Sequence, residues 1–308
     1  MSNQKYEDLE VKYGLPKEVK FCKKCVLSNQ RPQPTQEFRF TSESSKKTTG
    51  FDDDGVCFAC RYAEMKDSVI DWDAREKELM ALCDRFRSKD GSYDCIVPGS
   101  GGKDSAFTSH ILKHKYGMHP LTVTWAPHTY TDIGWKNFQQ WIHSGFDNIL
   151  ITPNGHVHKL LTRLAFENLL HPFQPFVFGQ RFAGLRMAQK FNIPLVFHGE
   201  SPFEYGSRTI GEAEASGFEK SYFCNDGDLS KTFIGGESVT DIIRDHDISL
   251  NDLQLYLPFT EDELSTFPLE YKFLGYYLKW DPQEAYYYAV EHTGFEANPE
   301  RVEGTYSK

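Results

Sequence analysis

Residues 98–105, Pro-Gly-Ser-Gly-Gly-Lys-Asp-Ser, place small residues beside a lysine, an aspartate and hydroxyl groups. The apolar run 93–98 predicts a buried strand before this loop, and the residues after it predict a helix. Small residues let a ligand approach the backbone closely, and the free amides of a helix N-terminus attract an anion. Lys103 adds a full positive charge, and Ser100 and Ser105 add hydroxyl donors. The loop therefore predicts a phosphate-binding site.

Asp104 distinguishes this loop from two commoner phosphate loops. A Walker A loop has glycine where Val97 stands, and serine or threonine where Asp104 stands. A dinucleotide-binding fingerprint has a third small residue at the position of Asp104. Because an acid inside a phosphate loop repels its ligand unless a cation intervenes, Asp104 predicts a Mg²⁺ ion that bridges it to the phosphates.

Four of the seven cysteines form two Cys-x-x-Cys pairs, Cys22 with Cys25 and Cys57 with Cys60. Four thiolates at this spacing can close a tetrahedral site around one ion, with no position left open for a substrate. We therefore predict a structural zinc site, with an iron–sulfur cluster and unliganded thiols as the alternatives. Three scattered cysteines are predicted to be small buried apolar residues: Cys83, Cys95 and Cys224.

The sequence Ser-Gly-Gly-Lys-Asp-Ser after a strand resembles the pyrophosphate loop (PP-loop) of the N-type ATP pyrophosphatases. These enzymes split ATP into AMP and pyrophosphate while they adenylate a carbonyl-type oxygen. Together with the two cysteine pairs, Gly199-Glu200 and the Glu-Tyr-Gly at 204–206, the chain from residue 21 onward resembles the N-acetyl sugar amidotransferase family of surface-polysaccharide (lipopolysaccharide O-antigen) sugar biosynthesis. The Ser-, Thr- and Lys-rich stretch 41–50 departs from this family as an insertion, and we expect a further helical tail where the sequence stops at Lys308.

The family resemblance implies a reaction and a set of site residues. The acetamido oxygen of a nucleotide-linked N-acetyl sugar would be adenylated by ATP, and ammonia would then replace it to give an acetamidino sugar. The ammonia would come from a separate glutaminase subunit with a cyclase-like barrel partner. Lys103, Asp104 and Glu200 would be catalytic, Thr124 and Trp125 would border the adenine, and Gly199 the phosphates. The implied ATP-binding residues are Gly99, Ser100, Gly101, Gly102, Lys103, Asp104, Ser105, Thr124, Trp125 and Gly199, with Asp104 also holding Mg²⁺ through ATP.

Two other functions fit parts of the sequence. A tRNA-thiolating enzyme shares the PP-loop and often has paired zinc knuckles, but its chemistry needs reactive cysteines or a cluster near the loop. Cys95 and Cys224 are the candidates outside the four paired cysteines. A non-catalytic zinc-binding adaptor is the third hypothesis, against which the intact loop argues.

Further candidate residues have both a functional and a structural interpretation. Gln180, Arg181 and Arg186 lie on a predicted helix that could direct guanidinium groups at a phosphate or a sugar nucleotide. His110 and His114 share a helix face, which we interpret as solvated rather than metal-binding. The aromatic residues between 271 and 288 could stack on sugars or bases, although core packing is the simpler interpretation.

The spacing of apolar runs predicts the fold that holds these residues. Predicted strands at 93–98, 121–125, 148–152 and 193–198 alternate with helices, which indicates an α/β protein with a doubly wound, mostly parallel sheet of the PP-loop type. A helix is expected over 62–88, and a capped helix runs from Asp281 to about His292, ending before Gly294. The expected domains are 1–64, a zinc-knuckle module with a loop insertion; 65–92, a linker helix; 93–250, the PP-loop domain; and 251–308, a mainly helical region.

The composition is that of an ordinary soluble globular protein, which we expect to be cytoplasmic. The 308 residues carry a formal net charge of −10, which is concentrated in residues 201–308 with 21 acids and 8 bases. The sequence has no concentrated run of basic residues of the kind that binds nucleic acid, so we do not expect a nucleic-acid partner. No apolar run approaches the ~18 residues of a membrane span, and the polar N-terminal residues do not resemble a secretion signal.

Overall fold

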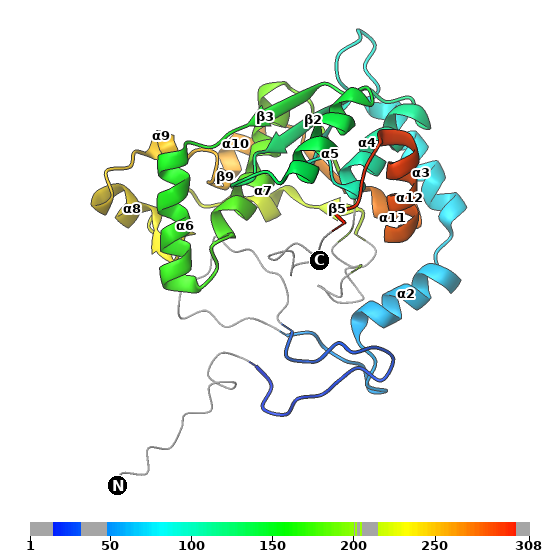
Figure 1. Ribbon diagram of the computed structural model, residues 1–308, viewed down its shortest axis with the longest axis horizontal. Helices are drawn as coiled ribbons and strands as arrows, with labels where there is room; N and C mark the ends of the chain where they lie inside the picture. The colour runs from blue at the N-terminus through cyan, green and yellow to red at the C-terminus, as the bar shows by residue number, and fades with distance from the viewer. Residues whose placement is uncertain (1–14, 32–47, 200, 202–203, 205–214, 300–308) are drawn as a thin grey trace.

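The computed structural model describes residues 15–31, 48–199, 201, 204 and 215–299. Its main feature is a sheet of six strands in the order β3-β2-β1-β4-β10-β5. Figure 1 labels β2, β3 and β5 of this sheet. All neighbouring pairs are parallel except β10 with β5. The strands are β1 (Cys95–Pro98), β2 (Pro120–Trp125), β3 (Asn148–Ile151), β4 (Leu195–His198), β5 (Gly217–Phe218) and β10 (Glu270–Phe273).

Helices cover both faces of this sheet, as a doubly wound fold requires. Alternate residues of β1 show the two faces: Ile96 packs in one apolar cluster, whereas Cys95 and Val97 pack in another. Helices α6 (Gly155–Leu169) and α7 (Gln174–Lys190) supply the first cluster. The second cluster is supplied by α3 (Trp72–Phe86), α4 (Lys103–His114) and α11 (Leu274–Tyr277).

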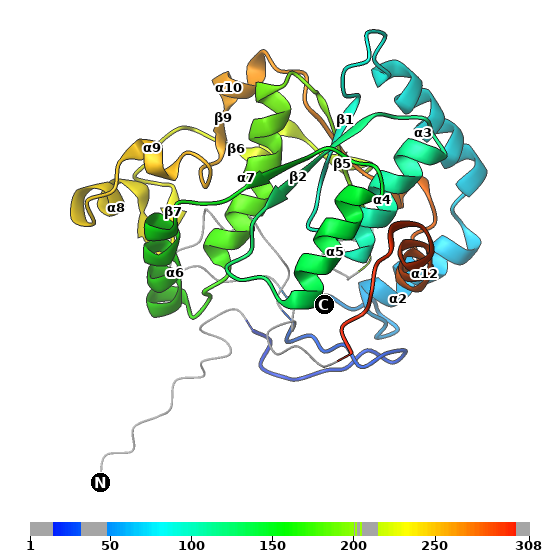
Figure 2. The same cartoon turned by 45° about the horizontal axis from the view of Figure 1, so that its top comes forward.

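Figure 2 shows α5 (Asp132–His143) beside α4, and α12 (Pro282–Thr293) at the same end of the molecule. Helix α12 packs against α4. The carboxylate of Asp281 accepts hydrogen bonds from the amides of Gln283 and Glu284, and Gly294 ends the helix with φ of +69°. The fold-class prediction and the prediction of this capped helix are confirmed.

The expectation of one helix over 62–88 is wrong, because two helices occupy this part of the chain. Helix α2 (Phe58–Ser68) ends at Ser68, and α3 begins after Asp71. The Asp71 side chain accepts a hydrogen bond from the amide of Ala74 and thereby caps α3. The aspartate that starts the second helix therefore also marks the break.

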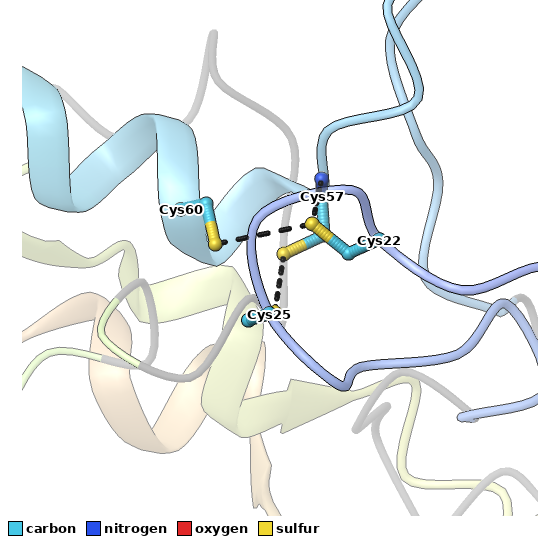
Figure 3. Close-up of side chains that lie close together, drawn as sticks. All are labelled: Cys22, Cys25, Cys57 and Cys60. Carbon is cyan, nitrogen blue, oxygen red and sulfur yellow. Dashed lines mark hydrogen bonds between the residues drawn. The ribbon is translucent and has the colours of Figure 1, made fainter.

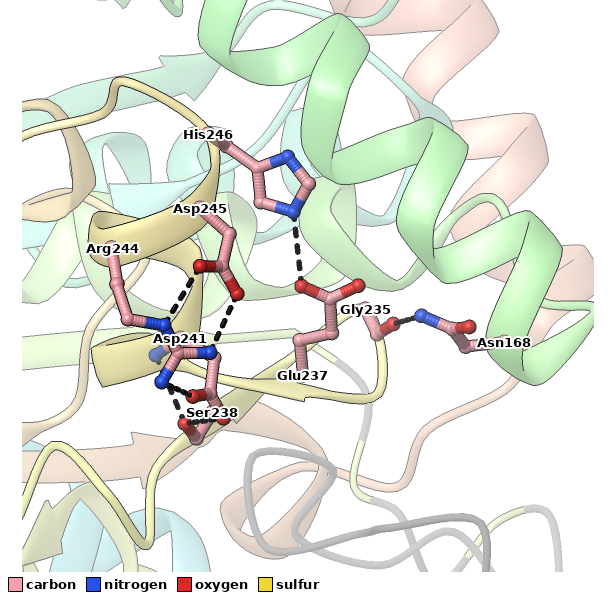
Figure 4. A network of polar contacts seen from close by, with 8 residues as sticks. All are labelled: Asn168, Gly235, Glu237, Ser238, Asp241, Arg244, Asp245 and His246. Atoms are coloured by element: carbon pink, nitrogen blue, oxygen red, sulfur yellow. Dashed lines mark hydrogen bonds and ion pairs between the residues drawn. The ribbon is translucent and has the colours of Figure 1, made fainter.

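Residues 215–265 form short elements around the sheet; the sequence analysis assigned no elements within 200–250 and predicted a mainly helical region from 251. Figure 4 shows a polar network that fixes part of this region to α6: the side-chain amide of Asn168 donates to Gly235 O over 2.9 Å, and His246 pairs with Glu237 at 3.1 Å. The elements are the 3₁₀ helix η4 (Lys220–Phe223), β6 (Cys224–Asn225), β7 (Phe233–Ile234), β8 (Glu237–Ser238), α8 (Val239–Asp245), α9 (Leu250–Leu253), β9 (Phe259–Thr260) and α10 (Glu261–Ser265).

Most of the insertion predicted at 41–50 lies outside the described residues, as does Glu200. Among the helices of the described residues, none combines the length and the apolar character that a bilayer crossing needs.

Candidate active site: a glycine loop at the switch point of the sheet

The predicted phosphate loop lies where the strand order of the sheet reverses. Strands β2 and β3 lie on one side of β1, and β4 lies on the other. The carboxyl ends of β1 and β4 therefore meet at the switch point, where open α/β sheets bind their ligands. Gly99 follows β1 at this point, and Gly199 follows β4.

The N-terminus of α4 is arranged to accept an anion. Gly102 is the N-cap residue, and no side chain caps the helix. The first-turn amides of a helix have no partner within the helix, and they carry its partial positive charge. Because no side chain occupies this end, an anion at the loop can take these amide hydrogen bonds.

Three glycines leave the backbone close to its neighbours. Gly101 has φ of +85°, and a Cβ atom there would lie 2.7 Å from the Cα atom of Phe138 on α5. A Cβ atom on Gly99 would lie 2.2 Å from the Cβ atom of Ser105. Gly199 leaves no room for a side chain beside Thr108, whose Oγ1 would lie 2.6 Å from an added Cβ. These positions therefore require glycine because of their neighbours within the chain, a reason separate from the close approach of a ligand that the sequence predicted.

A cavity of about 450 Å³ opens at this loop. Its walls come from the loop, the end of β2, one side of α7 and the strands at the far edge of the sheet. The lining residues are Pro98, Gly99, Ser100, Gly102, Asp104, Ser105, Val123, Trp125, Val177, Gln180, Arg181, Gly184, Leu185, His198, Gly199, Ser201, Phe218, Tyr222, Phe223, Tyr271 and Phe273.

The cavity collects many of the predicted ATP-binding residues, but not all of them. Gly101, Lys103 and Thr124 are not among its lining residues. Val123 and Trp125 face the cavity, so Thr124 between them points to the opposite side of β2. Thr124 is fully buried, and its hydroxyl oxygen accepts a hydrogen bond from the side-chain amide of Asn148 over 3.0 Å.

Lys103 and Asp104 form an ion pair at the start of α4. The Nζ atom of Lys103 lies 2.5 Å from Oδ1 of Asp104, and both side chains are largely shielded from solvent. Asp104 also lines the cavity. A phosphate or a metal ion entering the cavity would therefore compete for groups that here bind each other.

Helix α7 presents two of its three predicted polar residues to the cavity. Gln180 and Arg181 line it. Arg186 does not: its guanidinium pairs with Glu263 at 3.1 Å and donates to the carbonyl oxygens of Leu257 and Pro258. Arg186 therefore has a structural role, and Arg181 is the cation that remains at the cavity.

The sequence analysis missed the aromatic wall of the cavity. Tyr271 belongs to the aromatic-rich stretch that we interpreted as packing, but it lies on strand β10. Phe273 follows at the same face of this strand, which the sequence did not predict. The alternation Tyr-Lys-Phe was the available signal, although four residues are too few for a clear strand period. The wall also contains Phe218, Tyr222 and Phe223.

The four paired cysteines converge between the N-terminal loop and the start of α2 (Figure 3). Their sulfur atoms all lie within 4.8 Å of one another, with Cys22 to Cys60 at 3.9 Å and Cys25 to Cys57 at 3.6 Å. Sulfurs at 2.3 Å from one tetrahedral ion are ~3.8 Å apart. The cluster thus fits a single metal ion with four thiolate ligands.

Backbone amides favour the thiolate form in this cluster. The amides of Cys57 and Lys24 donate to the sulfur of Cys22 over 3.2 and 3.3 Å. Burial raises the pKa of this thiol, but the amide hydrogen bonds outweigh burial and lower the pKa to about 6. Burial raises the pKa of the Cys60 thiol, and the neighbouring cysteine side chains raise it further.

The other cysteines are buried, as predicted, and none lines the cavity in the described part of the chain: Cys83, Cys95 and Cys224. Burial raises the pKa of the Cys95 and Cys224 thiols. The interpretation of a solvated His110–His114 face is wrong for His110, which shares a 2.7 Å hydrogen bond with Tyr288 of α12.

Together, the sheet and the cavity define a doubly wound α/β protein with a glycine loop at its switch point and a separate cluster of four cysteines that fits one metal ion. No family model matches the chain. An uncharacterized protein of Methanocaldococcus jannaschii is 28% identical over 82 residues, which are 27% of this chain and 29% of that protein.

Solved structures with some likeness include NH3-dependent NAD synthetase from Campylobacter jejuni, with a TM-score of 0.32 and 14% identity over 76% of this chain and 100% of that one. NMN synthetase from Francisella tularensis gives a TM-score of 0.33 and 13% identity over 76% of this chain and 99% of that one. A U34-tRNA thiolase from Methanococcus maripaludis gives 0.29 and 11% over 92% of this chain and 75% of that one. At these TM-scores the likeness carries no argument, and the fold is defined by the strand order of this chain itself.

Proposed function

We propose that this protein is an ATP-dependent C–N ligase that converts the acetamido group of a nucleotide-linked N-acetyl sugar into an acetamidino group. The observation that carries the proposal is the glycine loop, which aims an uncapped helix N-terminus into a cavity at the switch point of the sheet. The resemblance of its sequence to a PP-loop supplies the reaction class, and the family resemblance supplies the acceptor.

The reaction needs activation because an amide is a poor electrophile. The acetamido oxygen attacks the α-phosphorus of ATP, and pyrophosphate leaves with the electron pair of the broken P–O bond. Ammonia then adds to the activated carbon and loses a proton, and AMP leaves with the former acetamido oxygen. The loop amides and Lys103 would stabilise the negative charge that develops on the departing pyrophosphate.

Two metal ions belong to this proposal. Mg²⁺ would be held by Asp104 together with the phosphates, and it would supply neutralisation of their charge. Zn²⁺ would be held by the four paired cysteines, where four thiolates leave no position for substrate, so its role is structural. Glu200 remains a proposed catalytic residue from the family resemblance.

Ammonia is proposed to come from a separate glutaminase with a barrel-shaped partner. Glutamine hydrolysis needs an activated nucleophile, usually a cysteine beside a base. In the described residues, four cysteines form the metal cluster and the other three are buried. The absence of cysteine from the cavity lining also weighs against tRNA thiolation, which we retain as the alternative outcome of the test.

The test is an analysis of products from the full chain with ATP, Mg²⁺, ammonium and UDP-linked N-acetyl sugars. We expect AMP, pyrophosphate and a sugar product in equal amounts, with a mass about one unit lower because NH replaces O. Asp104→Asn should lower kcat by at least ~100-fold, since the side chain loses its charge but keeps its shape. The exposed Asp84→Asn is the matched control. ADP and orthophosphate as products, or sulfur transfer to tRNA, would contradict the proposal.

A further inference from the structure

The cavity has two ends that different parts of the chain build. The loop between β1 and α4 forms one end. Side chains from η4, β5 and β10, together with Arg181 of α7, form the other end. ATP is proposed to bind at the first end. No ligand has yet been assigned to the second end.

Arg181 is the cation of this second end. Its Nη1 atom is buried and has no hydrogen-bond partner within the described residues. Burying a guanidinium nitrogen without a hydrogen-bond partner costs free energy, which makes the site favourable for an anionic ligand. Arg186, five residues further along the same helix, differs because its two terminal nitrogens bond Glu263 and two carbonyl oxygens, although its Nε atom also has no partner within the described residues.

Stacked aromatic rings lie beside this cation. The rings of Phe218 and Tyr222 are 3.9 Å apart at 14°, and Tyr271 lies 5.7 Å from Phe218 at 22°. The guanidinium group of Arg181 lies 5.6 Å from the Tyr222 ring centre. Burial raises the pKa of the Tyr271 phenol, so that it stays a neutral hydrogen-bond donor. Such rings can cover the face of a base or of a sugar ring.

Two polyanionic substrates in one cavity need separate cationic anchors, because like charges repel strongly where water is excluded. The loop and the uncapped N-terminus of α4, with its partial positive charge, are suited to the triphosphate of ATP. Arg181 is suited to a second phosphate group, since a guanidinium fork can donate two parallel hydrogen bonds to it. The adjacent rings then supply an apolar contact for a base or sugar, which free phosphate does not have.

We propose that Arg181 and the aromatic wall of Phe218, Tyr222 and Tyr271 form the acceptor subsite, where Arg181 binds the diphosphate of a nucleoside diphosphate sugar and the rings hold its base or sugar. This inference rests on the proposed function for its ligand class. It adds that acceptor and ATP bind to separate anchors in the same cavity.

The experiment measures calorimetric binding of UDP-N-acetylglucosamine to the full chain without ATP, and of ATP with Mg²⁺ in a separate titration. Arg181→Ala should weaken UDP-N-acetylglucosamine binding by about tenfold or more and leave ATP binding within about twofold. Phe218→Leu should weaken the sugar nucleotide several-fold, and Arg181→Lys should restore part of the loss. Arg163→Ala, on the exposed side of α6, is the matched control, and thermal melting verifies that each variant is folded.

Three results would overturn the inference: unchanged UDP-N-acetylglucosamine binding in Arg181→Ala, no binding by the unaltered chain, or an equal loss of ATP binding in that variant. The proposed function fails separately. If UDP-N-acetylglucosamine binds through Arg181 but no AMP is formed with any acceptor, the subsite stands and the reaction is wrong. If AMP and an acetamidino sugar are formed while Arg181→Ala changes neither acceptor KM nor binding, the reaction stands and the subsite is wrong.

Discussion

Gly101 shows how a single residue type makes the loop possible. Its φ of +85° lies in the left-handed region, which side chains with a Cβ atom adopt at a cost of about 1–2 kcal/mol. The neighbouring backbone of α5 adds a steric limit, because an added Cβ atom would lie 2.7 Å from the Cα atom of Phe138. Unlike a flexible side chain, that helix backbone cannot give way locally.

We therefore expect Gly101→Ala to displace the loop from α5 and to lower kcat/KM for ATP by at least ~100-fold, while the sheet stays folded. The measurement is steady-state AMP formation together with ATP titration. Gly155→Ala is the matched control, because a Cβ atom there has no heavy atom within 4 Å and the residue lies on α6. Similar activities of the two variants would show that the loop tolerates movement and that its geometry is not decisive.

Residues close together in sequence were predictable, and those brought together by folding were not. The loop at 98–105 and the two cysteine pairs carry their chemistry in short spacings, so the sequence alone indicated them. Thr124 was assigned to the site together with Trp125, but neighbouring residues of a strand face opposite sides. Phe218 and Tyr271 meet only because β5 pairs with β10, and no local pattern encodes that contact.

At the scale of elements, the contact between α4 and α12 contains a group of histidines. His110 of α4 lies 4.1 Å from His114 on its own helix and 5.4 Å from His292 on α12, measured between ring centres. It also shares a hydrogen bond with Tyr288, and Lys113 lies near enough to act on its charge. Burial lowers the pKa of His110 to about 4, with further contributions from its histidine neighbours and Lys113.

This contact should make the fold sensitive to acid. Below pH ~6.5 the unfolded chain protonates His110, whereas the folded chain resists protonation until about pH 4. The unfolded state therefore binds more protons in this window, and stability decreases as the pH falls through it. We expect His110→Gln to reduce the loss of Tm between pH 7.5 and 5, as measured by thermal unfolding. His143→Gln, an exposed residue, should follow the unaltered protein, and parallel curves for all three proteins would refute the role of His110.

Helices and strands were predicted correctly where the hydrophobic pattern extends over enough residues or where a capping sequence is present. The four predicted strands, β1 to β4, and α12 follow their expected positions closely. The expected helix over 62–88 was divided by Asp71, because a capping aspartate and a charged helix surface look alike in sequence. Strands of two to four residues such as β5 and β10 form only through their neighbours in the sheet, and their own residues give too weak a signal.

On the scale of the whole molecule, α2 connects the metal cluster with the cavity. Cys60 lies in the first turns of this helix and Lys66 near its end. Nζ of Lys66 lies 2.5 Å from Oε2 of Glu204, which follows β4, and 3.0 Å from the carbonyl oxygen of Trp280. Both members of the ion pair are largely buried, at 12% and 7% exposed. The orientation of α2 therefore affects the segment beside the cavity.

Loss of a metal ligand should accordingly act on folding first. We expect Cys57→Ser to purify with less than half of the zinc of the unaltered chain, with lower solubility and a Tm lower by several degrees, because three thiolates hold the ion that joins these segments less tightly than four. Metal analysis and thermal melting measure both effects. Cys83→Ala is the matched control, since it removes a buried thiol but should keep the zinc content. A folded Cys57→Ser protein that lacks zinc and keeps full activity would contradict a supporting role for the metal.

Because β10 comes late in the sequence, the sheet can be completed only late in synthesis. Strands β1 and β4 and the glycine loop are complete once the chain reaches residue 199, but β4 then still has a free edge. That edge is paired only when residues 270–273 return to it, and the antiparallel β5 then pairs with the outer side of β10. During synthesis the nascent chain must therefore expose an unpaired apolar strand for about 70 residues, which is the kind of edge that recruits other chains. The strand that finishes the cavity is thus also the one that protects the growing protein from aggregation.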